Sequence, residues 1–161
     1  MPDLLCEICN KHFNVPTKDY KLLSDFAGKL CSADCLIKKI KTLEKTNNTY
    51  TLAEDDLPIG NWWSSEFSTV FRSRFEELTA KLLRQNDLNF FYEKYVFYID
   101  DVPYTPDFYV PEHDCFLEVK GVWTLGKKKK LKKFVERYPT VNFLVVPWIL
   151  NGDIDAATSI R

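Results

Sequence analysis

The sequence contains no apolar stretch long enough to cross a membrane. Its longest apolar run, FLVVPWIL at Phe143 to Leu150, falls far short of the ~20 residues that a membrane-spanning helix needs. The first residues, MPDLLCEICN, also lack the basic stretch and following apolar run of a secretory signal. We therefore expect a soluble cytoplasmic protein with no membrane partner.

A large excess of charge of either sign is missing as well. The formal net charge is −1 at pH 7, so any contact with nucleic acid must come from local basic patches rather than from the overall charge. Hydrophobic residues make up 45% of the 161 residues and aromatic residues 15%, which is too apolar for a disordered chain. The length fits one ordinary domain or two small ones.

Cysteine, in contrast, is concentrated near the N-terminus. Cys6 and Cys9 form a C-x2-C pair, and Cys31 and Cys35 form a C-x3-C pair. Two pairs at such a separation can hold zinc tetrahedrally, and a segment this short needs a metal to fold because its core is too small. We predict one structural Zn²⁺ at these four cysteines, rather than four unrelated buried cysteines, and a free thiol at Cys115.

The sequence around the second cysteine pair matches a known pattern. Its sequence, KLCSADC, resembles the FCS/MYM-like zinc finger, and this resemblance implies that the pair opens a helix, here SADCLIKKIKTLEK. Ser32 is a suitable N-cap for that helix. The helix has lysines that could contact phosphates, but fingers of this kind also serve as protein-docking or purely structural modules.

A polar, acidic segment follows the finger. The residues TNNTYTLAEDDLPIG, at 46 to 60, are typical of a linker. We predict a zinc-finger domain at residues 1–50, a linker at 51–60 and a second domain at 61–161.

The second domain shows alternating helix and strand patterns. Apolar residues at spacings of three and four predict one long helix, or two, over residues 61 to 86. In this region Trp62 and Trp63 are expected in the core or at a domain interface, and Glu77 is expected to face water. Strand patterns follow at 92–99, 102–110 and 115–123, then a helix at 127–138 and a buried strand at 140–148. This order predicts an α/β (α+β) fold with a mixed sheet flanked by helices.

Charged residues gather around one predicted hairpin. Asp107 follows a proline, and Glu118-Val119-Lys120 comes after ten intervening residues, beyond a polar turn at 112–114. Side chains alternate along a strand, so Glu118 and Lys120 share a face, and the turn brings Asp107 near them. Two carboxylates this close repel each other, and Mg²⁺ or Mn²⁺ would remove that repulsion. A solvated hairpin with a surface Glu–Lys pair is the simpler alternative.

The same residues resemble the PD-(D/E)xK nuclease superfamily, which has a restriction-endonuclease-like core. Within it they are most similar to the phage endonuclease I type of Holliday-junction resolvase, through RSRFE at 72–76, YTPDF at 104–108 and EVKGVW at 118–123. The resemblance implies Glu76, Asp107, Glu118 and Lys120 as catalytic residues. It also implies a magnesium site made by Asp107, Glu118, Glu76 and the backbone carbonyl of Val119.

Basic side chains follow and precede this motif. A run of lysines, Lys127, Lys128, Lys129 and Lys130, comes directly after the predicted catalytic strand and could grip the DNA backbone. Arg72 and Arg74 precede Glu76 and could add phosphate contacts. A solubilising helix face is the alternative for the lysines.

These patterns together predict a Mg²⁺-dependent DNA endonuclease with a structural zinc. Branched or four-way junction DNA is one candidate substrate, and the resemblance then implies a homodimer, because two symmetric strands must be cut. A sequence-specific or homing-type endonuclease that uses the finger for site recognition is an alternative. A non-catalytic DNA-binding or protein-docking module is an alternative of another class. The expected location is the cytoplasm, the nucleoid, or the host cytoplasm if a phage encodes the protein.

Overall fold

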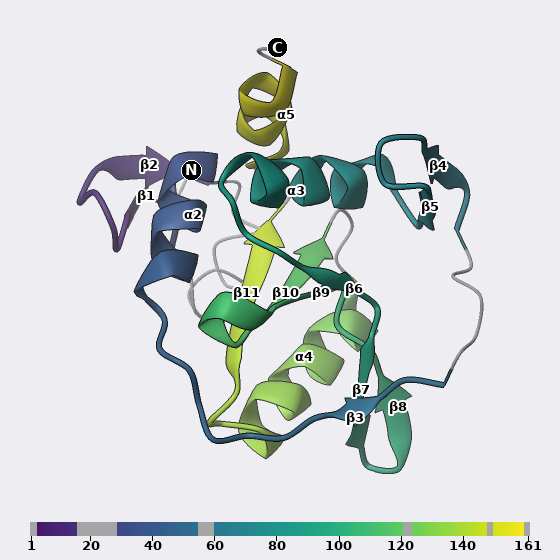
Figure 1. Cartoon of the computed structure of the whole chain (residues 1–161). Helices are drawn as coiled ribbons and strands as arrows, with labels where there is room; N and C mark the ends of the chain where they lie inside the picture. Colours follow the sequence, from purple (N-terminus) through teal and green to yellow (C-terminus); the bar gives the residue numbers. More distant parts are fainter. Residues whose placement is uncertain (1–2, 16–28, 55–59, 121–123, 148–149, 160–161) are drawn as a thin grey trace.

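The computed structural model describes residues 3–15, 29–54, 60–120, 124–147 and 150–159 (Figure 1). The predicted linker falls partly outside these ranges, as do the last residues of the EVKGVW motif. The described part is a mixed α+β fold, which confirms the predicted fold class. Within these residues no helix is both long and apolar enough to span a bilayer.

The central sheet has four strands in the order β11–β10–β9–β6. These are β6 (Phe91–Tyr92), β9 (Phe108–Val110), β10 (Cys115–Lys120) and β11 (Asn142–Pro147). β9 and β10 form the predicted antiparallel hairpin, joined by the short helix η1 (Pro111–His113), whereas β10 and β11 run parallel. The sheet is therefore mixed, as predicted, and its parallel pair is connected through α4 (Leu125–Arg137).

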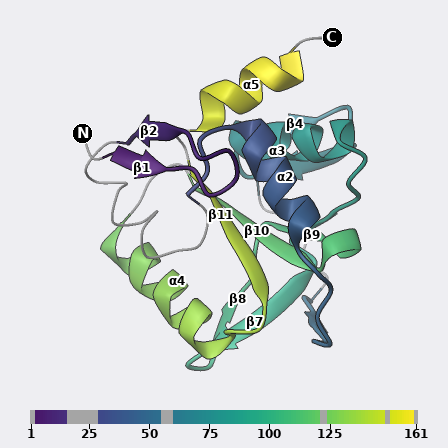
Figure 2. The same ribbon diagram turned by 90° about the vertical axis from the view of Figure 1, so that its left-hand side faces the viewer.

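The two faces of β10 pack against different layers. Leu117 and Val119 lie in a hydrophobic cluster with residues of α2 (Ala33–Thr42) and α3 (Arg74–Gln85). Phe116 lies in a second cluster with Leu131 and Phe134 of α4. Figures 1 and 2 show α4 on one side of the β10–β11 pair and α2 and α3 on the other. The alternation expected from the sequence thus decides which side chains face each layer.

A separate hairpin lies beside the central sheet. β7 (Tyr95–Ile99) pairs with β8 (Val102–Tyr104), and β3 (Thr51–Leu52) pairs with β7. The turn residues Asp100 and Asp101 both have positive φ, of 49° and 64°, as a tight hairpin turn requires. The single strand predicted at 102–110 was wrong, because the chain leaves β8 at Thr105 and enters the central sheet only at Phe108.

The helix predicted over residues 61 to 86 is correct only in its second half. Residues 62–71 form a hairpin of β4 (Trp62–Ser64) and β5 (Thr69–Phe71), and α3 starts afterwards, with Ser73 as its N-cap. The segment WWSSEFSTVF is rich in aromatic, β-branched and hydroxyl residues, which favour strands and turns over helix. Gly60 is required here, because a Cβ at this position would lie 2.3 Å from the backbone oxygen of Phe71.

The tryptophans and Glu77 are placed differently from the prediction. Trp62 is 41% exposed and Trp63 62%, so neither is buried in the core. Glu77 is buried rather than solvated, and its Oε1 accepts a hydrogen bond of 3.1 Å from the indole N–H of Trp62. The β4–β5 hairpin, which lies where a helix was predicted, therefore covers one face of α3.

The N-terminal residues pack onto the same core as the central sheet. β1 (Asp3–Leu5) pairs with β2 (His12–Asn14), and Ser32 caps α2 as predicted. One buried cluster contains α2 residues such as Leu36 and Ile40 together with Leu117 of β10. A final helix, α5 (Asn151–Ser159), packs on α2 and α3; the sequence did not predict it because it has little apolar periodicity. The domain boundaries stay a prediction.

A buried aspartate joins the segment after α2 to the β9–β10 turn. Asp114 has left-handed backbone geometry, with φ of 46°. One carboxylate oxygen accepts hydrogen bonds from the amide and hydroxyl of Thr46. The other accepts from the hydroxyls of Tyr50, at 2.7 Å, and Tyr109, at 3.0 Å. Burial acts to raise the pKa of Asp114, but these hydrogen bonds outweigh it and lower the pKa.

We expect Asp114→Asn to lower the free energy of unfolding by about 1–3 kcal/mol, because one of the two acceptor oxygens is lost. The lowered pKa means that the ionised carboxylate stabilises the folded state. This contribution is complete above the unfolded-state pKa of about 3.9 and is lost as the pH falls through the lower folded-state value. Urea unfolding from pH 3 to 7 should therefore show a gap between wild type and variant that narrows in acid.

Asp101→Asn is the matched control, since Asp101 also has a positive φ but is exposed. It should change stability by less than about 0.5 kcal/mol. A gap for Asp114→Asn that stays constant over the whole pH range would contradict the role given to its charge.

Candidate active site

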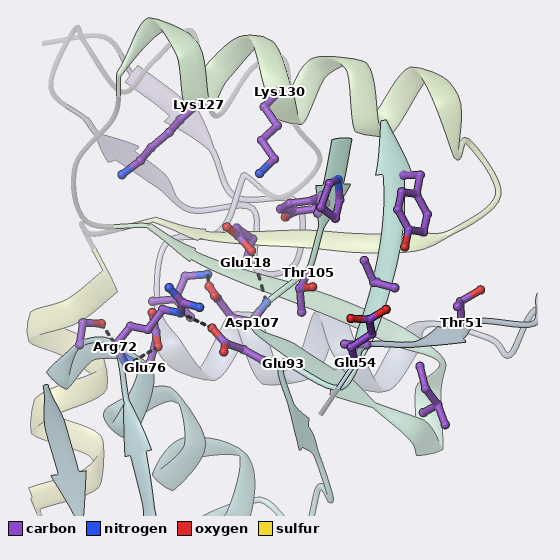
Figure 3. Close-up of a pocket in the computed structure, with 18 of the residues that line it drawn as sticks. Thr51, Glu54, Arg72, Glu76, Glu93, Thr105, Asp107, Glu118, Lys127 and Lys130 are labelled. Atoms are coloured by element: carbon purple, nitrogen blue, oxygen red, sulfur yellow. Dashed lines mark hydrogen bonds and ion pairs between the residues drawn. The ribbon is translucent and has the colours of Figure 1, made fainter. Parts of the chain in front are cut away.

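A pocket of about 920 Å³ opens between α4, the start of α3 and the two hairpins β7–β8 and β9–β10. Three of the four predicted catalytic residues line it: Glu76, Asp107 and Glu118 (Figure 3). Their exposed fractions are only 6%, 7% and 4%. The structure therefore brings three buried carboxylates from separate parts of the chain into one pocket.

The β9–β10 hairpin positions two of these carboxylates. Leu117 pairs with Phe108 in the antiparallel hairpin. Glu118, which follows Leu117, therefore lies across from Asp107, which precedes Phe108. The amide of Asp107 donates to Glu118 Oε2 at 3.3 Å, and the amide of Val119 donates to Asp107 Oδ2 at 2.7 Å. Two backbone amides thus fix the carboxylates at the end of the hairpin.

Glu76 comes from the first turn of α3. Its Oε2 accepts hydrogen bonds from the backbone amide of Arg72, at 3.1 Å, and from the hydroxyl of Tyr92, at 2.5 Å. Burial raises the pKa of Glu76, and the negative charges of Glu93 and Glu118 raise it further, although the two hydrogen bonds oppose the shift. The negative charges of other carboxylates in the pocket therefore contribute to the raised pKa of Glu76.

A fourth acid, Glu93, also lines the pocket, and sequence reasoning missed it. Its backbone has φ of 47°, and its amide donates to the carbonyl of Asp107 at 2.9 Å. The side chain of Arg72 donates from Nε to Glu93 Oε1 at 2.5 Å. No motif marked Glu93, because its place beside Asp107 arises from the pairing of β6 with β9.

Only some of the predicted cationic residues reach the pocket. Figure 3 shows Lys127 and Lys130 extending from α4 toward the carboxylates, with Arg72 on the other side. Lys128 and Lys129 do not line this pocket. Arg74 is paired with Asp155 of α5 at 3.0 Å. Cations thus surround the carboxylates from both α4 and the residues before α3.

The remaining predicted site residue is Lys120, the last residue of β10. Its side chain lies outside the described part of the structure, so its assignment stays a prediction.

The pocket can be compared with known proteins. The sequence profile of the phage endonuclease I family matches residues 59–148, which is more than half of the chain. The chain belongs to the phage endonuclease I family. Glu76, Glu93, Asp107 and Glu118 lie inside the matched residues, whereas Glu54, which also lines the pocket, and the cysteines of the N-terminal segment lie outside them.

Two relatives match the same part of the chain. Endonuclease I of Escherichia phage T7 is 34% identical over 81 residues, which are 48% of this chain and 54% of the relative. Endodeoxyribonuclease 1 of Enterobacteria phage T3 is 35% identical over 81 residues, 48% of this chain and 53% of the relative. The chain therefore spans about half the length of the curated relatives it matches. No solved structure matches it.

The carboxylates of this endonuclease I family member suit a divalent cation. Hard oxygen donors in this number, with room for water, are the ligands that Mg²⁺ and Mn²⁺ prefer. Burial is the main cause of the raised pKa of Glu76, and the charges of Glu93 and Glu118 raise it further, so a cation beside these acids would stabilise their ionised forms. The donor set therefore fits the metal that the sequence predicted.

The four N-terminal cysteines form a second candidate metal centre. The sulfur atoms of Cys6, Cys9, Cys31 and Cys35 all lie within 4.8 Å of one another. The Cys9–Cys31 and Cys31–Cys35 distances are 3.5 and 3.8 Å, close to the ~3.8 Å expected between thiolates bound tetrahedrally at ~2.3 Å from zinc. Burial acts to raise the pKa of Cys6, but hydrogen bonds from nearby backbone amides lower it to about 6.

We expect Glu76→Gln to raise the midpoint of thermal unfolding by a few degrees in buffer containing a chelator. Glutamine keeps an acceptor for Tyr92 and Arg72 but removes the buried charge. Because the pKa of Glu76 is raised on folding, its ionisation destabilises the folded state as the pH rises above the unfolded-state value of about 4.3. The gain should therefore be absent near pH 4 and grow toward pH 7 in calorimetric scans.

The neighbouring Glu77 provides a control of opposite sign. Burial acts to raise its pKa, but the nearby Ser64 hydroxyl, the hydrogen bond from Trp62 and the charge of Lys81 lower it. Glu77→Gln should therefore lower the unfolding midpoint at neutral pH. If both variants lost stability equally, the conclusion that the buried charge of Glu76 destabilises the folded protein would be disproved.

Proposed function

We propose that this protein is a metal-dependent DNA endonuclease that hydrolyses phosphodiester bonds in the carboxylate pocket. The observation that supports it most is the meeting of Glu76, Asp107 and Glu118, buried, in one pocket. Two relatives in the family are named endonuclease I and endodeoxyribonuclease 1, which supports DNA as the partner. A non-catalytic module of the same fold would have no need to keep three buried acids in one pocket.

Asp107, Glu118, Glu76 and the carbonyl of Val119 are the proposed ligands of Mg²⁺ or Mn²⁺. A divalent cation held there supplies Lewis-acid stabilisation of the phosphate and makes a bound water more acidic. Lys120 follows the ligands on β10 and is assigned to position the attacking water. Attack on the phosphorus would leave a 5′-phosphate and a 3′-hydroxyl.

The cations around the pocket are assigned to the DNA backbone. Lys127 and Lys130 reach into the pocket from α4, and Arg72 lies across from them beside Glu93. A phosphate held between these groups would lie directly over the carboxylates. Arg72 and Arg74 are each paired with an acid, Glu93 and Asp155, and both stay candidates for phosphate contacts.

Four-way or branched DNA is the substrate that family membership favours. Cutting a junction on two symmetric strands requires two active sites, so this proposal includes a homodimer. A sequence-specific endonuclease is the second candidate, and the N-terminal cysteine centre, which lies outside the family match, is the feature that favours it.

The decisive experiment is a cleavage panel of supercoiled, linear, flapped and four-way DNA with Mg²⁺ or Mn²⁺. Asp107→Asn should reduce cleavage by about three orders of magnitude or more while DNA affinity, measured by fluorescence anisotropy in chelator, stays within about threefold. Faster cutting of the junction than of every duplex supports a resolvase. Cutting at one duplex sequence supports the second candidate.

Glu136→Gln, an exposed acid on α4, serves as the matched control and should cleave at the wild-type rate. The endonuclease proposal fails if wild-type protein cuts none of these DNA forms with either metal.

For the N-terminal segment we propose one structural Zn²⁺ at the four cysteines. Purified protein should contain about one equivalent of zinc by elemental analysis. Cys9→Ser should lose most of it and unfold at a lower temperature, because the metal replaces the missing core of this segment. Cys115→Ala, which changes a buried thiol outside the cluster, should keep the zinc. Metal-free wild-type protein with an unchanged unfolding midpoint would contradict the site.

A further inference from the structure

One hydroxyl in the pocket differs from the other buried tyrosine hydroxyls. Tyr104 is only 5% exposed, and among the described residues its hydroxyl has no hydrogen-bond partner. By comparison, the hydroxyl of Tyr92 donates to Glu76, those of Tyr50 and Tyr109 donate to Asp114, and that of Tyr138 donates to the carbonyl of Tyr98. Tyr104 is therefore an exception that needs a physical reason.

The ring of Tyr104 is held firmly without the help of its hydroxyl. β8 pairs Tyr104 with Phe97 of β7, and the ring packs edge-on against Phe134 of α4 at 5.1 Å between centroids. Lys130 Nζ lies 4.8 Å from the same ring centroid. A phenylalanine would make all these contacts. An unpartnered buried hydroxyl costs about 1–3 kcal/mol, so packing alone does not explain a tyrosine here.

The hydroxyl lies beside the reacting centre rather than at a random place in the core. Tyr104 lines the pocket together with Asp107 and Glu118; burial raises the pKa of its phenol, and the charges of both carboxylates raise it further. A weak interaction with the Glu118 carboxylate adds to this shift, although no hydrogen bond of normal length and angle joins the two groups. Lys130, which lies over the ring, lines the same pocket. Tyr104 and Lys130 thus line the same pocket as the acids, where a phosphate would be bound.

We propose that the Tyr104 hydroxyl donates a hydrogen bond to a nonbridging oxygen of the phosphate that is cleaved. The hydroxyl acts as a donor and transfers no proton. It would stabilise the negative charge that grows on this oxygen as the water attacks. The inference rests on the proposed endonuclease function and adds a catalytic residue to it.

Tyr104→Phe removes this donor and keeps the ring. The single-turnover cleavage rate, measured on whichever DNA the wild type cuts, should fall about 100-fold. DNA affinity in chelator should stay within about twofold, and the unfolding midpoint should stay equal or rise, because a buried unpaired hydroxyl is gone. A fall in rate together with a fall in stability would instead indicate a structural role and would overturn the proposal.

A phosphorothioate substrate tests the contact itself. Sulfur in place of the contacted oxygen weakens the hydrogen bond, so wild-type protein should cut one of the two diastereomers more slowly than the all-oxygen substrate. The Tyr104→Phe variant should lose most of that penalty, because its donor is already missing. Equal penalties in the two proteins for both diastereomers would show that Tyr104 contacts Glu118 or a water instead, and would overturn the proposal.

Tyr98→Phe is the matched control, since Tyr98 lines the same pocket but is exposed, and it should cleave within about threefold of wild type. The outcomes also separate the two proposals. If the wild type cuts DNA and the Tyr104→Phe variant cuts it equally fast, only the role of Tyr104 is overturned. A wild type that cuts no DNA overturns both.

Discussion

The burial of three carboxylates in one pocket is the constraint on which this site depends. Two unit charges 4 Å apart repel by about 4 kcal/mol at the effective dielectric constant of ~20 that describes most protein sites. Glu76, Asp107 and Glu118 are each less than a tenth exposed, so water screens them poorly. The chain holds them in place with directed hydrogen bonds from the backbone of Arg72, Asp107 and Val119, and a rigid scaffold must supply the rest.

That scaffold is the β9–β10 hairpin and the elements that hold its two ends. One end has Asp107 and Glu118, and the turn at the other end is tied by Asp114 to Thr46 and Tyr50. The residues that hold the turn therefore come from the segment between α2 and β3, far away in the sequence. Because β10 also packs on both faces, a shift of the hairpin would disturb two hydrophobic clusters at once.

Local patterns in the sequence were enough to predict the hairpin and its acids. A turn at 112–114 and alternating side chains fix which residues of two adjacent strands face each other, so Asp107 and Glu118 follow from short-range rules. Glu76 followed from a family resemblance. Glu93 and Tyr104 could not be found in this way, because their places depend on β6 pairing with β9 and on β8 packing under α4. Such contacts between distant segments leave no local trace.

The errors have a similar physical origin. Phe67 and Phe71 recur at a spacing that suits a helix, yet in the structure they pack against each other, 5.8 Å apart, from the β4–β5 hairpin. Periodicity alone cannot distinguish these arrangements when the segment is short and aromatic. The ion pair of Arg74 with Asp155 was also missed, because α5 has few apolar residues and so gave no helical signal. The predicted DNA contact of Arg74 stays a prediction.

The N-terminal segment is best understood from the residues that it buries. Cys6 and Cys35 belong to the same cluster as Leu117 and Val119, which flank Glu118 on β10. A metal that fixes the cysteines would therefore stabilise one face of the strand whose other face holds Glu118. Two lysines of α2, Lys38 and Lys39, are paired with Asp34 and Glu7, which leaves less charge for phosphates. The shared hydrophobic cluster joins this segment, which lies outside the family match, to the strand that holds Glu118.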